Sequence, residues 1–435
     1  MLTLLLACTG PSAEPLDVLR PTAVADSESG ATLTISWTTD EPTDALAEVG
    51  TDEGYGDIVE GWSSEDGLEH AVVLAGLAGG NVWHWRAISR GVNGASASDD
   101  QTFVPGAPPA GLPDLHVTGE GTGLLLAPVL AGSASYLALY DSDGRPVWWR
   151  HLGDEFVPVN QARLSLDRRA VLYVYPNTDG TTQLVRAPIA GGPTRTWELG
   201  LAHHDFLELE GGGFAYIAAH EREIDGWRVQ GDKLVEVDAD GVSTDVWSTW
   251  DDLQPPALDT LVEVSPGILD WTHVNSVARA DGQYWLSSYH EHALYRVDHA
   301  GLDLVIGGRD SDLALTAGPG FGPQHAPYPT DDGFLVFNNR EVQSGDLWSE
   351  AVEFSVDLDA GTYARTWAHD ADHEVFSPVF GNVEPTESGD LLVGWGSAGR
   401  TSLVSREGEE RWVAETPLGF AFGFSHHVAA LSGRP

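Results

Sequence analysis

The stretch HVNSVARADGQYWLS, residues 273–287, carries the pattern that decides the fold. A histidine precedes a short strand, a turn containing Gly282 follows about eight residues later, and an apolar strand comes next. Four other stretches repeat this unit, and the C-terminus carries its first half. They are NQARLSLDRRAVLYVY (160–175), HHDFLELEGGGFAYI (203–217), HAPYPTDDGFLVF (325–337), NVEPTESGDLLVGW (382–395) and HHVAALSGRP (426–435).

A second unit, a strand pair that ends in an acidic-glycine turn and a tryptophan, alternates with the first. Clear copies are ALYDSDGRPVWW (138–149), LVEVDADGVSTDVW (234–247), FSVDLDAGTYARTW (354–367) and LVSREGEERW (403–412). The turn glycines of six copies recur 47 to 60 residues apart, at Gly144, Gly192, Gly241, Gly301, Gly361 and Gly408. Four short strands per repeat of this length are typical of a β-propeller. We therefore predict an all-β protein with a six-bladed β-propeller over residues 115–435, closed by pairing of the C-terminal half-unit with TGLLLAPVL near Leu126.

Residues 18–104 are predicted to form a separate module. Runs such as ATLTISW (31–37) alternate apolar with polar residues, and about seven such strands in this length indicate a small β-sandwich. The stretches TISWTTDEP and LAGLAGGNVWHWRAISR, with Gly76 and Arg86, resemble a fibronectin type III module. That resemblance implies a spacer or adhesive domain without catalysis. The Pro- and Gly-rich residues 105–114 are predicted to be a linker.

The N-terminal residues 1–8, MLTLLLAC, have the shape of a bacterial lipobox that ends at Cys8. Acylation of the Cys8 thiol would anchor an otherwise soluble protein through a polar tether, residues 9–17. We therefore expect a periplasmic or outer-membrane lipoprotein of the cell envelope that contacts the membrane only through its lipid. No other stretch approaches the roughly 18 apolar residues of a membrane span. Because the basic region of a full signal peptide is missing, we expect the natural start to lie upstream of Met1.

The composition excludes several classes of function. The chain has 66 acidic and 22 basic residues and a formal net charge of −44, whereas binding to nucleic acid depends on clustered Lys and Arg. The single cysteine, Cys8, excludes an intramolecular disulfide and a cysteine-based zinc site. Neither a Gly-rich phosphate loop nor a dinucleotide fingerprint is visible, so we predict no nucleotide cofactor.

Equivalent positions of a propeller repeat lie on one ring around the central channel. Four of the six unit starts are histidines, which we expect to converge at one mouth of that channel: His204, His273, His325 and His427. The other two are Asn160 and Asn382. One alternative is that all these side chains only cap turns in a wet channel.

The ring could bind a metal ion or an anion. Imidazoles bind zinc or copper, but HExxH-like spacing is missing from the chain. Arg340 lies at the end of the strand that follows His325, and guanidinium is the preferred partner for sulfate or phosphate oxygens. These observations favour an anion site, so we predict no metal.

Three stretches of the chain resemble the bacterial arylsulfotransferase family. They are LDWTHVNSVARADGQYWLSSYHEHALYRVD (269–298), FGPQHAPYPTDDGFLVFNNRE (321–341) and FSPVFGNVEPTESGDLLVGWG (376–396). The resemblance implies an exported six-bladed propeller enzyme that moves a sulfuryl group from a phenolic sulfate ester to another phenol without a nucleotide donor. Its partners would be small-molecule aryl sulfates and phenols, and it would need no cofactor.

The resemblance also implies catalytic roles. His273 and His325 match the two active-site histidines of the family, and Arg340 matches its sulfate-binding arginine. In the family the sulfuryl group passes through a histidine on a blade that follows the arginine, but here that blade begins with Asn382. The expected nucleophile is therefore His427 or His204.

Other residues of these stretches would support the reaction. His273 or His325 would act as acid and base on the phenolic oxygens, while Arg340 stabilises the sulfuryl oxygens in the transition state. Asn275 and Asn382 are expected to help bind the ester. Trp271 is expected to form the floor of an aromatic substrate pocket.

Two other functions fit the same sequence. One is a catalytically silent surface lipoprotein that uses its propeller to bind an anionic or sulfated ligand. The other is a metal-dependent propeller hydrolase or lyase. Turnover of an aryl sulfate would separate the sulfotransferase from the first, and stoichiometric metal would favour the second.

Overall fold

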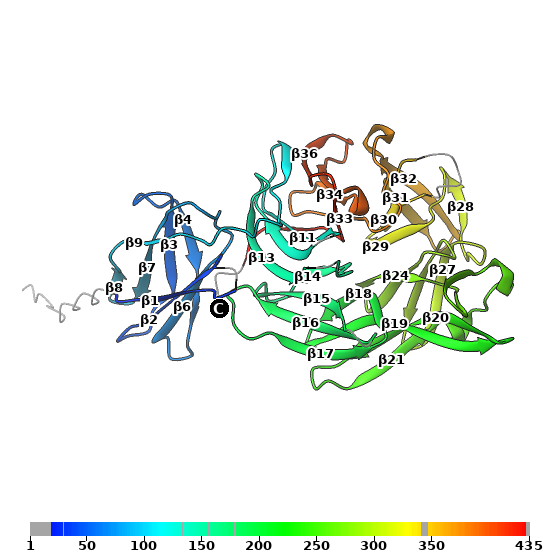
Figure 1. Cartoon of the computed structure of the whole chain (residues 1–435), viewed down its shortest axis with the longest axis horizontal. Helices are drawn as coiled ribbons and strands as arrows, with labels where there is room; N and C mark the ends of the chain where they lie inside the picture. Colours follow the sequence, from blue (N-terminus) through cyan, green and yellow to red (C-terminus); the bar gives the residue numbers. More distant parts are fainter. Residues whose placement is uncertain are drawn as a thin grey trace, which may run out of the picture. The chain divides into compact units, whose positions relative to one another are not determined.

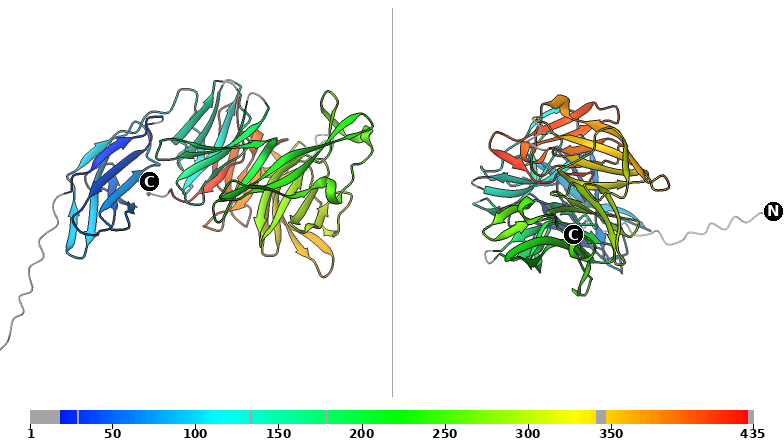
Figure 2. Two further views of the ribbon diagram at one scale, coloured as in Figure 1. Left: turned by 90° about the horizontal axis from the view of Figure 1, so that it is seen from below. Right: turned by 90° about the vertical axis from the view of Figure 1, so that its right-hand side faces the viewer.

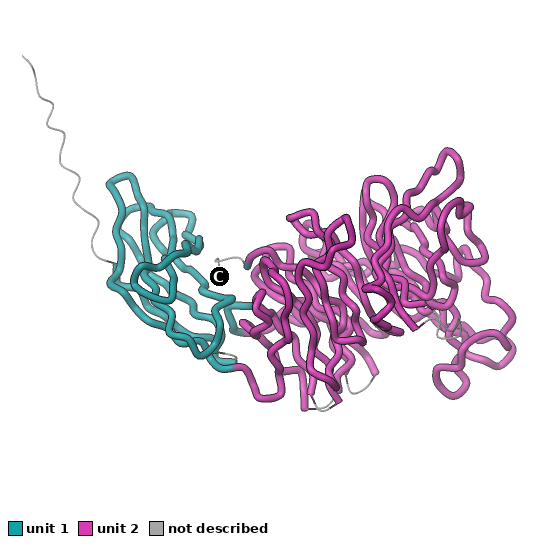
Figure 3. Tube along the Cα trace, turned by 90° about the horizontal axis from the view of Figure 1, so that it is seen from above, with its two compact units in different colours: residues 1–107, 189–192, 431–435 teal, residues 108–188, 193–430 magenta. Residues whose placement is uncertain are grey.

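The computed structural model describes residues 19–28, 30–132, 134–154, 156–177, 180–340 and 347–431. The predicted lipobox at Cys8 and the tether that follows it lie outside this part of the chain. Two compact units are present (Figure 3). Unit 1 comprises residues 1–107, 189–192 and 431–435, and unit 2 comprises residues 108–188 and 193–430.

Unit 1 consists of two sheets that share one apolar core. The first sheet is ordered β1 (Thr22–Ala25), β2 (Leu33–Thr38), β6 (Glu69–Leu74) and β5 (Trp62–Ser63). The second is ordered β4 (Asp57–Glu60), β3 (Leu46–Gly50), β7 (Trp83–Gly91) and β8 (Gly94–Ala97), and β9 (Gln101–Phe103) also pairs with β7. Alternation along β2 buries Ile35 and Trp37, which meet Trp85 of β7 in the core.

Unit 2 is built, within the described residues, from six sheets whose inner strands surround a common centre (Figures 1 and 2). The fold is therefore all-β and propeller-like, as the repeats predict. The first three sheets in chain order contain β11 (Leu124–Ala131), β12 (Ala134–Tyr140) and β13 (Pro146–Gly153); β14 (Ala162–Leu164), β15 (Ala170–Pro176), β16 (Thr182–Pro188) and β17 (Arg195–Gly200); and β18 (Ala202–Leu209), β19 (Gly213–Ile224), β20 (Trp227–Val237) and β21 (Ser243–Ser248).

The next three sheets complete the ring (Figure 1). They contain β24 (Val274–Ala280), β25 (Gln283–Ser288), β26 (Ala293–Asp298) and β27 (Gly301–Gly307); β29 (Gln324–Thr330), β30 (Gly333–Asn338), β31 (Glu350–Asp357), β32 (Thr362–His369) and β28 (Ala314–Ala317); and β33 (Asn382–Pro385), β34 (Leu391–Gly394), β35 (Arg400–Val404) and β36 (Glu410–Glu415). The described residues between these strands include the short 3-10 helices η3 (Ala371–His373) and η4 (Gly396–Ala398).

The two ends of unit 2 close the ring by strand pairing. β38 (His426–Val428) pairs with β11 so that His426 faces Leu126, which is the pairing that the sequence predicts for the C-terminal half-unit. β37 (Phe420–Phe422) pairs with the other half of β11. In the last sheet, β10 (His116–Gly119) from the start of the unit pairs with β36. Both closing sheets therefore combine the two ends of the unit, which leaves no open edge between them.

Aromatic side chains fill the spaces between neighbouring sheets. The ring of Phe334 in β30 stacks on Phe354 at 5.2 Å and contacts Trp285 of the preceding sheet at 6.0 Å between ring centroids. The rings of Trp247 and Tyr295 meet at 5.7 Å across another such boundary. Full burial of one large apolar side chain contributes roughly 3 kcal/mol. This packing between sheets fixes the inner strands around the centre.

One insertion into the ring positions residues of the site. It contains α1 (Thr249–Asp252), η1 (Leu258–Thr260), β22 (Val262–Ser265) and β23 (Ile268–Asp270). β23 pairs in parallel with the extended end of β20, and Leu269 and Trp271 pack there on Val229 and Trp250. This packing holds Asp270 and Trp271 immediately before the inner strand β24. No helix of the described residues is long and apolar enough to cross a membrane.

Candidate functional site

Three neighbouring inner strands bring histidines together at their N-terminal ends. His204 lies in β18, His273 immediately before β24, and His325 in β29. The ring centroids of His204 and His273 are 4.8 Å apart. The ring of Tyr289 lies between the other two, 5.6 Å from that of His273 and 5.5 Å from that of His325. The structure thus brings together three of the four histidines that the repeat pattern singles out.

The backbone at this end of the inner strands departs from regular pairing. The φ angles of His204 and His273 are 60° and 46°, in the left-handed region that non-glycine residues rarely adopt. The strand register breaks beside both, between Ala202 and Phe206 and between Val274 and Ser276. Such bulges re-aim side chains, and the strain of about 1–3 kcal/mol per residue is characteristic of functional sites.

His273 forms a carboxylate–imidazole pair with Asp270. Its Nδ1 donates to Oδ2 of the buried Asp270 at 2.6 Å, which leaves Nε2 as the other reactive nitrogen. Burial lowers the pKa of His273, but the hydrogen bond and charge of Asp270, together with the charge of Asp232, outweigh it and raise the pKa above its ordinary value. The Asp270–His273 pair is therefore suited to hold and release a proton.

His204 ends a chain of hydrogen bonds that starts at a buried carboxylate. Asp232 accepts from His203 Nε2 at 3.0 Å, and in the neutral form of His203 its Nδ1 accepts from Nδ1 of His204 at 2.8 Å. Thr272 Oγ1 and the Val274 amide also donate to Asp232. The chain fixes the tautomer of His204 and leaves its Nε2 unprotonated. Burial, followed by the nearby His203, His273 and His325, holds the pKa of His204 well below its ordinary value.

His325 is held by an amide rather than by a carboxylate. Asn339 donates to the carbonyls of Ser377 and Phe380, both at 2.7 Å, so its Oδ1 faces His325 and accepts from Nδ1 at 2.7 Å. Burial lowers the pKa of His325 to about 3. The imidazole is therefore neutral at any ordinary pH, with the Nε2 lone pair available for attack.

A cavity of about 680 Å³ lies beside this cluster. Its volume falls in the range of small-molecule sites, roughly 300–1,000 Å³. Polar walls come from Asp270, Tyr289, His290, Glu291, Arg309 and Arg340, and apolar walls come from Leu261, Val262, Pro256 and Trp271. Trp271 thus lines this cavity, where the sequence predicts an aromatic pocket, and its indole donates to Glu291 at 2.9 Å.

Arg340 enters the cavity from the end of β30. Its guanidinium carbon lies 3.7 Å from the ring centroid of Trp348, a close cation–π contact. Its φ angle is 64°, so it shares the left-handed backbone of His204 and His273. Arg340 follows directly after Asn339, the partner of His325. The guanidinium and the His325 imidazole are therefore positioned by the same short segment.

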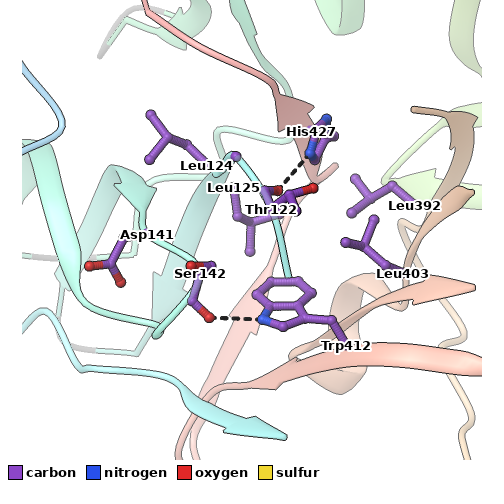
Figure 4. A pocket seen from close by; sticks show the side chains of 10 residues that line it. Thr122, Leu124, Leu125, Asp141, Ser142, Leu392, Leu403, Trp412 and His427 are labelled. Atoms are coloured by element: carbon purple, nitrogen blue, oxygen red, sulfur yellow. Dashed lines mark hydrogen bonds between the residues drawn. The ribbon is translucent and has the colours of Figure 1, made fainter. Parts of the chain in front are cut away.

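His427 does not join the other three histidines. Its Nε2 contacts the carbonyl of Thr122 at 2.8 Å, in a small pocket near Trp412 (Figure 4). Its neighbour His426 points to the opposite face of β38, where it contacts Gln161 and Glu384. Consecutive residues of a strand face opposite sides, so only one of this pair could face the channel. The predicted convergence of His427 with the cluster is wrong, and its contacts are those of the strand closure.

Asn275 and Asn382 make equivalent contacts within the protein. Asn275 is fully buried, and its Nδ2 donates to the carbonyl of Gln324, just before His325. Asn382 donates to the carbonyl of Ser425, just before β38, and accepts from the Ser425 amide. Both side chains therefore link an inner strand to the next one, and their polar atoms are occupied by the protein.

This equivalence corrects the alignment of the repeats. If Asn382 corresponds to Asn275, the residue that corresponds to His273 is Phe380, two positions earlier. Phe380 has a φ angle of 61°, close to that of His273. Its ring lies 6.4 Å from that of Phe424, which in turn lies 5.9 Å from that of His325. The sheet after Arg340 thus presents an aromatic residue where an aligned histidine would be expected.

Sequence reasoning missed the partners of the histidines. Asp270, His203 and Asn339 are themselves part of the motifs DWTH, HHD and NNR, so the predicted site residues beside them could have pointed to them. Asp232 carries no such signal, because only the fold brings β20 next to His203. Among the described residues, the group that could hold a metal ion consists of Asp270, His273 and His290, whose ligand atoms lie within 4.8 Å of one another.

Comparisons with solved structures give several distant similarities. A protein of unknown function from Bacteroides caccae is 12% identical with a TM-score of 0.45, over 70% of this chain and 98% of that one. The periplasmic gluconolactonase of Pseudomonas aeruginosa is 14% identical with a TM-score of 0.37, over 66% and 82%. A chain of the nidogen/laminin complex is 8% identical with a TM-score of 0.41, over 70% and 99%. No curated protein sequence matches the chain.

The sequence model of one family, described as arylsulfotransferase (ASST), matches residues 129–415. The matched region contains the histidine cluster, Arg340 and Asn382, and it ends before His427. The chain belongs to the arylsulfotransferase family.

Proposed function

We propose that the protein transfers a sulfuryl group from an aryl sulfate ester to a phenolic acceptor, without a nucleotide donor, through a sulfurylated histidine. Membership of the arylsulfotransferase family supports sulfotransferase activity in general, with small aryl substrates. The observation that carries the specific proposal is the assignment of protons in the histidine cluster. Each of three imidazoles has its Nδ1 hydrogen-bonded to a fixed partner, so each has Nε2 left for chemistry.

His325 is the proposed nucleophile. Its Nε2 lone pair attacks the sulfur atom as the bond from sulfur to the phenolic oxygen breaks. The proton on Nδ1 remains hydrogen-bonded to Asn339, whose amide is anchored by two main-chain carbonyls. His325 stays neutral because of its low pKa, so it needs no base to activate it. His204, which is also neutral, is the alternative nucleophile.

His273 is the proposed general acid and base. As the phenolic oxygen leaves sulfur, Nε2 of the protonated His273 gives it a proton, and Asp270 stabilises the imidazolium through Nδ1. In the second half-reaction, His273 Nε2 takes the proton of the acceptor phenol. That oxygen attacks sulfur, the nitrogen–sulfur bond breaks, and His325 returns to its neutral form.

Arg340 is the proposed partner of the sulfuryl oxygens. Charge on those oxygens shifts as sulfur passes between oxygen and nitrogen, and a guanidinium fixed beforehand stabilises it without reorganisation. The stack of Arg340 on Trp348 limits the mobility of the guanidinium. The aromatic ring of the substrate would occupy the apolar part of the cavity, near Leu261, Val262 and Trp271.

The test measures release of 4-nitrophenol from 4-nitrophenyl sulfate with and without a second phenol. Ping-pong kinetics are expected, and the donor alone should add one sulfuryl group to a peptide that contains His325, detected by mass spectrometry. The variants His325→Gln, His273→Gln and His204→Gln separate the roles, and His299→Gln, an exposed histidine paired with Glu236, is the control. Sulfurylation of His204 in place of His325 would identify His204 as the nucleophile. Saturable binding without product would favour a silent binding protein.

We also propose the finer architecture and the location of the protein. Each of the six sheets of unit 2 would be one blade of a six-bladed propeller, and unit 1 would be a fibronectin type III-like module. Lipid on Cys8 would hold the protein at the cell envelope. Expression with radiolabelled fatty acid tests the anchor: label is expected in the membrane-bound wild type and should be lost in Cys8→Ser, while equal labelling of both would refute it.

A further inference from the structure

We propose that Asp270, His273 and His290 form a binding site for one divalent transition-metal ion such as Zn²⁺, and that this ion inhibits sulfuryl transfer. The ligand atoms of the three side chains all lie within 4.8 Å of one another. Oδ2 of Asp270 lies 2.6 Å from Nδ1 of His273 and 3.8 Å from Nδ1 of His290. An ion that bonds at about 2.0–2.2 Å could therefore replace the Asp270–His273 hydrogen bond with only small movements of the side chains.

Two polar atoms of the group lack a hydrogen-bond partner within the described structure. Asp270 is 2% exposed, and neither its Oδ1 nor the Nδ1 of His290 has a hydrogen-bond partner within the described structure. A buried polar atom left without a partner costs about 1–3 kcal/mol. A cation between the three side chains would bond to carboxylate oxygen and to imidazole nitrogen. This observation, which is independent of the spacing, indicates that the group is completed by a ligand.

The backbone holds the three residues in place. Asp270 ends β23, which is paired with β20, and His273 lies three residues further on. The amides of Tyr289 and His290 donate to the carbonyls of His273 and Thr272, at 3.1 and 3.4 Å. All three ligands therefore come from one hydrogen-bonded corner of the fold. A site that is rigid before the ion arrives loses little entropy when it binds.

The donor set points to the class of ion. Two imidazoles and one carboxylate suit Zn²⁺, Co²⁺ or Fe²⁺ better than Ca²⁺ or Mg²⁺, which prefer oxygen ligands. Asp270 and His290 both line the 680 Å³ cavity, so the ion would have an entry path and open positions on that side. The net charge of −44 also concentrates cations around the protein.

Inhibition follows from the tautomer of His273, and this part of the inference rests on the proposed function. A metal ion on Nδ1 takes the lone pair there and displaces Asp270 as its hydrogen-bond partner. The remaining proton of the imidazole then stays on Nε2, so His273 can no longer take a proton from the acceptor phenol. The bound ion also occupies the cavity beside Arg340.

The experiment titrates Co²⁺ into protein stripped with chelator. One Co²⁺ per chain is expected, with the visible absorption bands of a nitrogen–oxygen site, and Zn²⁺ should displace it. Asp270→Asn and His290→Gln should weaken binding by at least about tenfold, while the control His299→Gln should bind as the wild type does. Circular dichroism and thermal melting check that each variant is folded.

The outcomes separate the two parts of the proposal. Absence of stoichiometric Co²⁺ in the wild type, or equal affinity in the folded Asp270→Asn and His290→Gln variants, overturns the site. Turnover of 4-nitrophenyl sulfate is then compared with chelator and with saturating Zn²⁺. Binding with an unchanged rate keeps the site and overturns the inhibition. Because the Co²⁺ titration needs no turnover, it also decides the site if the protein transfers no sulfuryl group.

Discussion

The inner strands β24 and β33 belong to two copies of the same sequence repeat, but they carry different residues at the position of the histidine cluster. Each carries an asparagine that bonds to the main chain at or next to the start of the next inner strand, Asn275 in β24 and Asn382 in β33. Two residues earlier, each chain passes through a left-handed residue, but this is His273 in one and Phe380 in the other. The asparagines thus repeat with the fold, whereas the histidine cluster is confined to one side of the ring.

The largest effect that would test this comparison concerns His325 and His427, which both begin a copy of the repeat in the sequence. We expect His325→Gln to lower kcat by about 10³–10⁴-fold, because it removes the proposed nucleophile, and His427→Gln to leave kcat within about twofold. The imidazole of His427 contacts the carbonyl of Thr122 in the strand closure, and its main-chain amide donates to Glu384. Steady-state rates with 4-nitrophenyl sulfate and a phenol measure both variants.

The reverse result would place the chemistry elsewhere. A large loss of kcat in a well-folded His427→Gln variant would show that the C-terminal histidine reaches the substrate, as the repeat pattern predicts. In that case the comparison between the two sides of the ring would no longer hold.

The second effect concerns arginines in two different cavities. Arg340→Gln should lower kcat/KM for the aryl sulfate by about 10²–10³-fold, since it removes a charged donor from the transition state. Arg279, which lines another cavity with Glu384 and His426, serves as the control. Arg279→Gln should leave kcat/KM nearly unchanged. Equal losses in both variants would mean that Arg340 acts only through the overall field of the protein.

Much of the fold could be predicted from the sequence because it rests on local patterns. The turn at Gly282 and its equivalents, the alternation of the strands and the half-unit at the C-terminus each leave a signal within one stretch. The pairing of the C-terminal half-unit with the strand near Leu126 follows from that half-unit, and the register of His426 opposite Leu126 comes from the structure. His273, His325 and Arg340 could likewise be found, because they occur in the motifs DWTH, QH and NNR.

The rest of the site depends on contacts between distant residues. Asp232 of β20 meets His203 of β18 only because β19 pairs with both strands, and no spacing in the sequence records that contact. The role of His427 depends on which face of β38 each residue occupies, and the repeat pattern does not specify this. The alignment of His273 with Asn382 failed because each residue begins a similar stretch of sequence, whereas the contacts of Asn275 and Asn382 show that the two copies are offset by two residues.

The third effect is a pH dependence on the side of the ring that lacks the histidine cluster. Glu410 of β36 accepts from His369 and Arg400, at 3.3 and 2.6 Å. Burial raises the pKa of Glu410, but these partners outweigh it and lower the pKa from 4.5 to about 2. Solvent screening of this partly exposed carboxylate keeps its contribution to stability below about 3 kcal/mol; the contribution is complete well above pH 4.5 and is lost as the pH falls toward 2.

Chemical denaturation at a series of pH values measures this effect. The free energy of unfolding of the wild type should fall across that interval more steeply than that of Glu410→Gln, which has no carboxylate to protonate. Parallel curves for the two proteins would mean that other carboxylates dominate the acid sensitivity.

The smallest effect separates the structural role of the asparagines from a role in binding. Asn382→Ala leaves the buried amide and carbonyl of Ser425 without their side-chain partner, which should lower the free energy of unfolding by about 2 kcal/mol. Asn275→Ala removes one of two donors from the carbonyl of Gln324, which still accepts from Ser287 Oγ, and should cost about 1 kcal/mol. The folded fraction of Asn382→Ala should keep its kcat and KM, because its side chain faces the next strand. A rise in KM without a loss of stability would instead place Asn382 on the ester, as the sequence suggests. In that case β24 and β33 would differ in how their asparagines bind substrate, as well as in the left-handed residue, His273 or Phe380, that precedes each asparagine by two positions.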